Sequence, residues 1–334
     1  MASIVKEGKY YKIYFIYGGK RIKRSLKTGS KKIALQIQRK IEDDLALGLF
    51  NIRNYSPHLQ KSLSEFIEEV VQYAKINKSS STVMREERIL KNFFKFVGDV
   101  PIQTIKSKII EAYKKYLLQE KDFSKNGVNI ELRHLSAAFS IAVKYDYILS
   151  NPFKKIQKVQ TPKKKPIYLT KNQAQQLLDF TRDRSIYPYI LISLSTGARI
   201  SEVCKLKFKD IDFENRTLRL HGKGSKERTV PIPKILYNYL TTNLDKSEFV
   251  VKGSRNPVEI THQFRKYADK IQLSNFTFHN LRDTYASWLV QSGQSLKIIQ
   301  ELLGHESIQT TLIYAHLAPD NKFEVIHVMD SFLK

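Results

Sequence analysis

Hydrophobic side chains recur at helical spacing over most of the chain. Between residues 57 and 153, four successive stretches place an apolar residue every three to four positions, which predicts four helices. Thr170 precedes a further stretch of this kind, and three more lie between residues 276 and 317. The pattern therefore indicates that helices make up most of the fold.

Two regions alternate like β-hairpins instead. Residues 10–17 are rich in strand-forming side chains, a Gly-Gly turn follows, and residues 20–26 resemble the returning strand. A helix capped by Ser30 carries an apolar stripe able to cover this sheet. Residues 216–221 and 227–232 form the second predicted hairpin. We therefore expect a mainly α fold with small β-sheets, of the α+β class.

These segments divide the chain into domains. Residues 1–55 form a small sheet with one helix, residues 57–155 a helical domain, and residues 167–334 a mixed, mostly helical domain. Residues 156–166 are a basic linker between the last two. The stretch 154–166 holds six lysines, two prolines and no acidic residue, so we expect it to be extended, solvated and poorly able to pack.

Composition adds information about partners and location. The net charge of +25, from 57 Lys and Arg against 32 Asp and Glu, implies a polyanionic partner, and nucleic acid is favoured over an anionic membrane. The longest apolar run, residues 187–194, falls far short of the roughly 20 residues that a membrane span requires. We therefore expect a cytoplasmic, DNA-associated protein. The single cysteine, Cys204, excludes an internal disulfide framework and is expected in the core.

The predicted helix that starts at the cap Thr277 and stops at Gly293 carries two candidate functional residues. His279 and Arg282 stand three positions apart near its start, so they share one side of the first turn, beside the apolar stripe. Both side chains can point into a site. Taken singly, each would be an ordinary surface or core residue.

Two further candidates follow on shorter elements. A helix opening at Ser295 ends at Gly304, and His305, directly after this glycine, is therefore expected on a loop. Ser307 opens a third short helix that leads to Tyr314. The pattern predicts that two neighbours of this tyrosine are buried, Leu312 and Ile313.

The combination of these residues resembles a known enzyme signature. H-x-L-R, then LGH, then a tyrosine nine residues later is similar to the C-terminal motif of the tyrosine recombinases, the phage-integrase family of DNA strand-exchange enzymes. The segment STGARISEVCKLKFKDID resembles the family segment that supplies the first active-site arginine, here Arg199, with Glu202 as a supporting residue. The family usually has a second histidine where this chain has Asp283, a position that we expect to be secondary.

The glycine-rich turn GKGSK of the second hairpin also matches the family. Its first lysine, Lys223, corresponds to the family's catalytic lysine, and Lys226 is a weaker candidate. The turn lacks the spacing and the strand-to-helix context of a nucleotide-binding loop, so we expect neither ATP nor another cofactor.

Two arginines, a lysine, two histidines and a tyrosine suit phosphoryl transfer at a DNA phosphodiester without a metal ion. The planar guanidinium groups of Arg199 and Arg282 can grip the non-bridging oxygens, where negative charge accumulates in the transition state. Tyr314 would supply the attacking oxygen. Because an unperturbed tyrosine has a pKa of about 10, a nearby base helps the attack.

The remaining roles follow from the same chemistry. We expect His279 to be the base and Lys223 to protonate the leaving sugar oxygen. His305 would hydrogen-bond a non-bridging oxygen and position Tyr314. A 3′-phosphotyrosyl bond conserves the energy of the broken ester, so a DNA 5′ hydroxyl could reseal the strand without ATP.

Charge is most one-sided at the N-terminus. Residues 1–40 hold twelve Lys and Arg and one acidic residue, Glu7, on the predicted sheet and its helix. This domain resembles the arm-binding domain of phage integrases, which implies a DNA groove as its partner. The candidate DNA-binding residues are Lys20, Arg21, Lys23 and Arg24 in this domain and Lys163, Lys164 and Lys165 in the linker.

The resemblance also implies an assembly. Four protomers, each a monomer when free in solution, would act on two duplexes, and residues 316–334 would dock onto a neighbour or pack on their own chain. The expected function is integration or excision of a phage or other mobile element. Two alternatives stay open: a type IB topoisomerase, which uses the same chemistry, and a DNA-binding architectural protein without catalysis.

Overall fold

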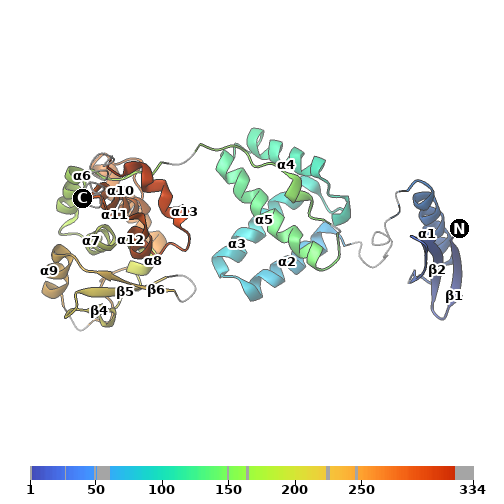
Figure 1. Cartoon of the computed structure of the whole chain (residues 1–334), viewed down its shortest axis with the longest axis horizontal. Coiled ribbons are helices and arrows are strands. Elements are labelled where there is room, and N and C mark those ends of the chain that lie inside the picture. The colour runs from blue at the N-terminus through green and yellow to red at the C-terminus, as the bar shows by residue number, and fades with distance from the viewer. Residues whose placement is uncertain are drawn as a thin grey trace, which may run out of the picture. The chain divides into compact units, whose positions relative to one another are not determined.

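The computed structural model describes residues 2–26, 28–48, 50, 61–148, 150–162, 165–222, 226–244 and 247–319. The chain separates into two compact units, residues 1–162 and 163–334, which are described one at a time (Figure 1). Most described residues are helical and each unit holds one small sheet, so the predicted mainly α fold class is confirmed. No helix in these ranges is long and apolar enough to cross a membrane.

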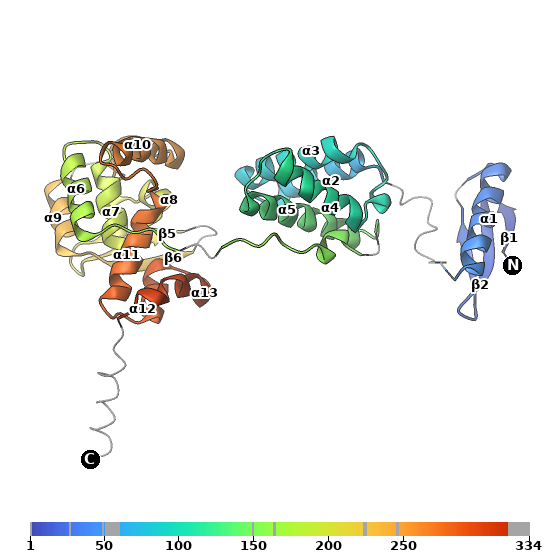
Figure 2. The ribbon, with the colours of Figure 1, turned by 90° about the horizontal axis from the view of Figure 1, so that it is seen from above.

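The N-terminal part of the first unit is a three-stranded antiparallel sheet covered on one face by a helix (Figure 2). Its elements are β1 (Ser3–Glu7), β2 (Tyr10–Tyr17), β3 (Lys20–Ser25) and α1 (Lys31–Ala46). Ile13 and Phe15 of β2 pack with Ala34 and Ile41 of α1 in a buried cluster. The hairpin and its helix agree with the prediction, except that Ser30, at the N-cap position, makes no side-chain capping hydrogen bond. Strand β1 was not predicted, because its sequence SIVKE shows no clear alternation and only its pairing with β2 defines it.

The rest of the first unit is a helical bundle. Its elements are α2 (Leu63–Asn77), α3 (Ser80–Val97), η2 (Ile102–Thr104), α4 (Ser107–Gln119), α5 (Lys125–Lys144) and η3 (Pro152–Lys155), where η denotes a 3-10 helix. Ser62 forms a capping box with Glu65 at the start of α2, and Ser124 caps α5. Phe93 and Phe139 meet edge to face in the core. The four predicted helices are therefore present in the described part of this region.

The predicted linker differs from expectation in its first half. Lys154 and Lys155 belong to the 3-10 helix η3, and residues 156–162 form neither helix nor strand, but Ile156 and Val159 pack against the hydrophobic core of the bundle. The side chain of Asn129 on α5 donates from Nδ2 to the carbonyl of Val159 at 2.8 Å and accepts its N–H at 2.9 Å. The prediction of a solvated stretch that packs poorly is therefore wrong here, because two apolar residues and one asparagine hold the chain against the bundle.

The second unit combines helices with a small antiparallel sheet in the order β4-β5-β6. Its elements are α6 (Lys171–Thr181), α7 (Tyr187–Thr196), α8 (Ile200–Val203), η4 (Phe208–Asp210), β4 (Ile211–Asp212), β5 (Thr217–His221), β6 (Glu227–Pro231), α9 (Lys234–Thr242), α10 (Pro257–Lys270), α11 (His279–Gln291), α12 (Leu296–Leu303), α13 (Ile308–Thr311) and η5 (Leu312–Leu317). Helix α7, which contains the longest apolar run, is buried along nearly its whole length. Cys204 is buried, as predicted.

Helix α11 packs against α7 and also contacts Leu169, near the start of the unit. The indole nitrogen of Trp288, the single tryptophan, donates to the carbonyl of Leu169 at 3.0 Å, and Thr284 Oγ1 accepts the Leu169 N–H at 3.0 Å. Gly197 ends α7 in the left-handed conformation with φ 66°, and an added Cβ there would lie 2.7 Å from the Tyr285 ring. Only glycine lets α7 end this close to α11.

The start of α11 differs from the prediction. The helix begins at His279 with Phe278 as its N-cap, so Thr277 is not the capping residue. Thr277 instead donates its N–H and its hydroxyl to Oδ1 of Asn280, at 2.7 and 2.8 Å. These contacts fix the orientation of the Asn280 amide inside the first turn.

Candidate active site

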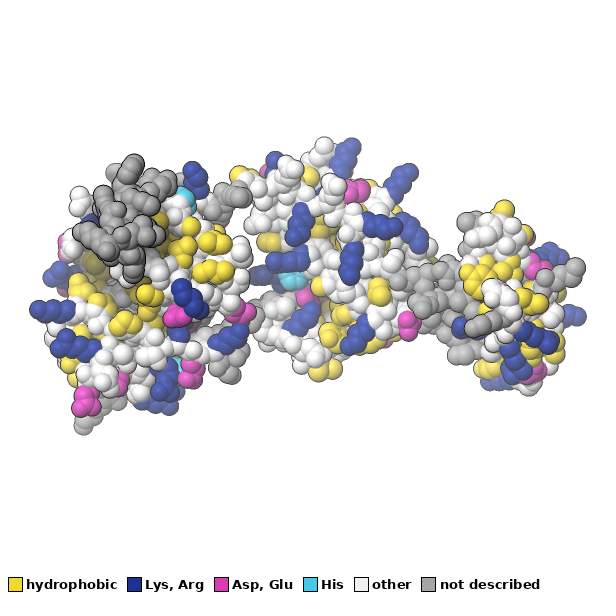
Figure 3. Space-filling view, viewed as in Figure 1, with side chains coloured by type: hydrophobic (Ala, Val, Ile, Leu, Met, Phe, Trp, Pro, Cys, Tyr) yellow, Lys and Arg dark blue, Asp and Glu magenta, His cyan; other side chains and the backbone are white. Residues whose placement is uncertain are grey.

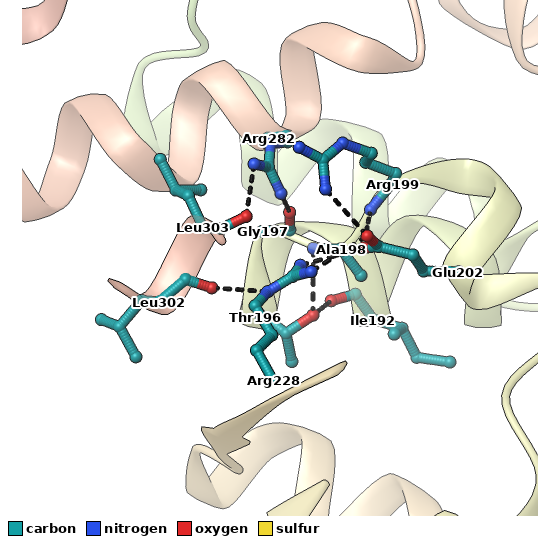
Figure 4. Close-up of polar contacts among 10 residues, drawn as sticks. All are labelled: Ile192, Thr196, Gly197, Ala198, Arg199, Glu202, Arg228, Arg282, Leu302 and Leu303. Carbon is teal, nitrogen blue, oxygen red and sulfur yellow. Dashed lines mark hydrogen bonds and ion pairs between the residues drawn. The ribbon is translucent and has the colours of Figure 1, made fainter. Parts of the chain in front are cut away.

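Arg282 lies in the first turn of α11 and is only 2% exposed. Its Nη1 donates to the carbonyl of Gly197 at 2.7 Å and its Nη2 to that of Leu303 at 2.5 Å, so the ends of α7 and α12 meet on one side chain (Figure 4). Burial, together with the charges of Arg199 and Arg228, lowers the pKa of Arg282 to about 9, which leaves it charged at neutral pH. The predicted place beside the apolar stripe is wrong, because this guanidinium is in the interior.

Arg199 reaches the same region from the turn after α7. It is the N-cap residue of α8, where its N–H donates to Oε2 of Glu202 at 2.8 Å and its Nη1 to Oε1 at 2.9 Å. Because 39% of the side chain is exposed, Arg199 is easier to reach from solvent than Arg282.

Glu202 is buried between two arginines, one of which sequence reasoning missed. Arg228 on β6 donates Nη1 and Nη2 to the two carboxylate oxygens, each at 2.9 Å, and Nε to the carbonyl of Leu302 at 2.8 Å (Figure 4). Burial alone raises the pKa of Glu202, but the contacts with Arg228 and Arg199 outweigh it and lower the pKa. A signal was available: alternation along β6 puts Arg228 on the face of buried Val230, where a charge requires a partner.

His305 lies on the loop after α12, as predicted. Its Nδ1 is 2.9 Å from Oγ1 of Thr311. Burial and the charges of Arg282, Arg199 and Arg228 lower the pKa of His305 to about 4. The ring is therefore neutral at neutral pH, and a neutral imidazole can donate one hydrogen bond to an anion bound among the arginines.

Tyr314 lies in the 3-10 helix η5 and is 2% exposed, whereas Leu312 and Ile313 are exposed. The prediction that these two neighbours are buried is therefore wrong. A 3-10 helix has three residues per turn rather than 3.6, so spacing counted for an α-helix assigns the wrong side chains to the interior.

The Tyr314 hydroxyl contacts a carboxylate on α11. It donates to Oδ1 of Asp283 at 2.6 Å, and Oδ2 of the same carboxylate accepts from Nδ2 of Asn280 at 2.9 Å. Burial, this hydrogen bond and the charge of Asp283 raise the pKa of Tyr314 above its ordinary value. Asp283, which was expected to be secondary, therefore contacts the hydroxyl of the predicted nucleophile.

The other predicted catalytic residues are placed as follows. His279 is the first residue of α11, its side chain is exposed, and its proximity contributes to the lowered pKa of His305. Lys223 lies outside the described residues. Lys226 forms an ion pair with Glu306, so the end of the hairpin turn contacts the loop that carries His305.

The candidate DNA-binding residues are spread over both units. Three are exposed on β3: Arg21, Lys23 and Arg24. Lys23 contacts Glu7 at 3.1 Å, and Lys165 is exposed. Outside the described residues lie Lys163, Lys164 and the side chain of Lys20. Over the helical bundle, the face seen in Figure 3 carries many Lys and Arg and few acidic side chains.

Taken together, the second unit brings Arg199, Arg282, His305 and Tyr314 into one neighbourhood, joined by Glu202 and Arg228. Fixed guanidinium groups can hold a phosphate, and a phenol can attack it. In the part of the chain that the structure describes, no group of three or more His, Cys, Asp or Glu side chains could hold a metal ion.

The sequence matches known families and proteins. Residues 168–321 match the phage integrase family, and residues 62–159 match the phage integrase SAM-like domain. The chain is 30% identical over 280 residues to tyrosine recombinase XerA of Pyrococcus furiosus, which covers 79% of this chain and 93% of that protein. It is 27% identical over 292 residues to tyrosine recombinase XerC of Halalkalibacterium halodurans, covering 78% and 95%.

Solved structures share the fold. A Tn1549 transposon integrase fragment in complex with circular intermediate DNA is 24% identical, with a TM-score of 0.66 over 80% of this chain and 99% of that chain. A lambda integrase tetramer bound to a Holliday junction is 17% identical, with a TM-score of 0.63 over 91% and 95%.

The fold and the arginine-rich site with its tyrosine define a DNA strand-exchange enzyme. The chain belongs to the tyrosine recombinase, or phage integrase, family, and it is a site-specific recombinase that cleaves and rejoins DNA.

Proposed function

We propose that this recombinase integrates or excises a phage or other mobile element, with Tyr314 as the nucleophile that forms a 3′-phosphotyrosyl bond. The observation that carries this proposal is the convergence of Arg199, Arg282 and His305 with Tyr314, whose hydroxyl donates to Asp283, the residue after Arg282 on α11. These residues come from four separate segments of the second unit.

The charges at the site are in place before DNA arrives. The repulsion that lowers the pKa of Arg282 comes from Arg199 and Arg228, and Glu202 offsets only part of it. A DNA phosphate bound between these side chains relieves that repulsion. As Tyr314 attacks, the added negative charge on the non-bridging oxygens falls near Arg199 and Arg282, and His305 donates a further hydrogen bond.

The leaving 5′ oxygen requires a proton, which Lys223 supplies in this proposal. Support comes from the other end of the same turn, because Lys226 contacts Glu306 beside His305. Lys226, at the end of the turn, therefore lies at the edge of the site. His279, at the start of α11, completes the set of groups near the phosphate.

The assembly is also a proposal. Lambda integrase forms a tetramer on a Holliday junction, and the Tn1549 integrase fragment binds circular intermediate DNA. We infer a tetramer of this chain on two DNA duplexes, formed from monomers in solution. The basic N-terminal sheet would bind a separate DNA site, and the helical bundle and second unit would grip the crossover site.

A nicked suicide substrate tests the nucleophile. When the strand is cut next to the nick, the short fragment that carries the new 5′ hydroxyl diffuses away. The enzyme remains attached to the 3′ phosphate of the other fragment. Wild type should form this adduct, and Tyr314→Phe should bind DNA with unchanged affinity but form none. An adduct with the Phe variant would show that another residue attacks the phosphate.

A further inference from the structure

The hydroxyl of Tyr314 has a carboxylate at hydrogen-bond distance. It donates to Oδ1 of Asp283 at 2.6 Å, within the range of about 2.5–2.7 Å for a hydroxyl bonded to an ionised oxygen. Both residues are buried. The contact joins η5 to α11 and involves the atom that attacks phosphorus in the proposed function.

Asp283 is itself held in place. Its Oδ2 accepts from Nδ2 of Asn280 at 2.9 Å, and Oδ1 of Asn280 accepts the N–H and the hydroxyl of Thr277. Because Thr277 occupies the amide oxygen, the amide nitrogen faces Asp283. The arrangement of nucleophile, carboxylate and orienting group is the one that activated nucleophiles use in other enzymes.

Other bases are less well placed. Nδ1 of His305 contacts Thr311, and a pKa of about 4 makes this imidazole a weak proton acceptor. His279 is exposed at the first position of α11. Since Tyr314 is only 2% exposed, bulk water has little access to the hydroxyl.

We propose that Asp283 accepts the proton of the Tyr314 hydroxyl during DNA cleavage, a role expected of His279 from the sequence. This inference rests on the proposed function. As the bond between Oη and phosphorus forms, the proton moves from Oη to Oδ1 of Asp283. The bond from phosphorus to the 5′ oxygen breaks, its electron pair stays on that oxygen, and Lys223 protonates it. Resealing reverses both transfers.

A carboxylate suits this step because proton transfer is coupled to attack. Burial and the charge of Asp283 raise the pKa of Tyr314, so a free phenolate is disfavoured before DNA binds. During attack, negative charge passes from the phenol oxygen to the phosphoryl oxygens near Arg199 and Arg282. The proton can then reach Asp283 without leaving two adjacent anions.

Single-turnover cleavage of the nicked substrate by full-length Asp283→Asn and Asp283→Glu tests this role. Asparagine keeps the size and can accept a hydrogen bond but cannot take the proton, so cleavage should fall by about 10²–10⁴-fold, the usual contribution of a general base. DNA binding should not change. Glutamate should restore part of the rate. Asp283→Gln gives the same comparison with Asp283→Glu if the Asn variant does not fold.

Two chemical substitutions separate proton transfer from positioning. A fluorinated tyrosine at position 314 has a more acidic phenol, which depends less on a base. It should therefore reduce the difference in cleavage rate between Asp283→Asn and the protein with Asp283. Sulfur in place of the leaving 5′ oxygen removes the requirement for a proton there. It should rescue Lys223→Ala and leave Asp283→Asn defective.

The outcomes are distinct. If wild type forms no adduct, the proposed function fails and this inference fails with it. If wild type forms the adduct and Asp283→Asn cleaves at the same rate, only the inference is overturned. Faster cleavage by Asp283→Asn would also overturn it, because the hydrogen bond would then restrain the tyrosine rather than activate it.

Discussion

The guanidinium of Arg282 is buried against two backbone carbonyls, while that of Arg199 stays partly exposed on the carboxylate of Glu202. Removing one partner from a buried charge costs several kcal/mol, so these hydrogen bonds stabilise the fold as well as the charge pattern. The two arginines therefore share a chemical role and differ in their structural role.

Replacing Arg282 by Lys should reduce cleavage by about 10²–10³-fold, the usual cost of removing one transition-state donor. Stability should also fall, because an ammonium lacks the planar fork that reaches both Gly197 and Leu303. Arg199→Lys should reduce cleavage to a similar extent with a smaller effect on stability. Single-turnover cleavage and unfolding followed by Trp288 fluorescence measure the two effects. Near-normal cleavage by either variant would show that this arginine does not stabilise the transition state.

The pKa of His305 predicts a pH dependence of stability. It is about 4 in the folded chain against an ordinary 6.5, so the unfolded chain binds a proton at pH values where the folded chain does not. The contribution of the neutral His305 ring to the free energy of unfolding is complete above pH 6.5 and is lost as the pH falls toward 4. The charged or titratable groups around it are Arg282, Arg199, Arg228 and His279.

His305→Asn keeps a polar side chain beside Thr311 but does not titrate. Between pH 7 and pH 5, the free energy of unfolding of this variant should therefore fall less than that of wild type. Urea unfolding followed by Trp288 fluorescence reports on the second unit alone, since the chain has one tryptophan. Identical pH dependence of the two proteins would contradict the lowered pKa.

At the level of elements, the site depends on how closely α7 approaches α11. Gly197 makes this approach possible, and its carbonyl accepts the Arg282 hydrogen bond. Two residues later the chain reaches Arg199. Gly197 therefore contacts one arginine and lies two residues from the other.

Gly197→Ala should destabilise the second unit by roughly 1–2 kcal/mol from the left-handed backbone and by roughly 1–3 kcal/mol more from the clash with Tyr285 and Leu303. Gly293→Ala is the matched control, because its φ is also positive, at 82°, but no heavy atom lies within 4 Å of the added Cβ. Unfolding followed by Trp288 fluorescence measures both. Equal destabilisation by the two substitutions would mean that the close approach at Gly197 is not tight.

Across the whole chain, charge and chemistry occupy different parts. The proposed catalytic residues lie in the second unit, whereas the basic sheet of the N-terminal part has a hydrophobic core of its own, formed with α1. An independent core allows this part to act as a separate DNA-binding module.

Deleting residues 1–55 should spare cleavage and resealing on short nicked core sites and strongly reduce recombination between full-length attachment sites. Each phosphate that the sheet neutralises contributes about 0.9 to the slope of log affinity against log salt, so the truncated protein should bind with a shallower salt dependence. Footprinting of both proteins on the element's end is the measurement. Protection of the same bases by the full-length and the truncated protein would show that the sheet only increases affinity for the core site.

Much of the local structure could be predicted from the sequence. Ser295 and Ser307 cap their helices through side-chain oxygens, and Gly304 ends α12 in the left-handed conformation, as their positions indicated. Caps and glycine stops act within a few residues, so they can be predicted from the sequence alone. The contact between the Asn129 side chain and the backbone of Val159 could not be predicted. The two residues are 30 apart, and every residue at position 159 except proline would offer the same N–H and carbonyl.

The amino-acid sequence was sufficient to predict the helical stretches, the hairpins, the basic charge and the motif positions of Arg199, Arg282, His305 and Tyr314. Only the folded chain shows that Arg282 is buried on the Gly197 carbonyl, 85 residues away, and that the Tyr314 hydroxyl, 31 residues from Asp283, donates to it. The physical reason is range. Periodicity and capping reflect forces between near neighbours along the chain, whereas a buried charge or hydroxyl selects its partner only when packing has brought distant segments together and excluded water.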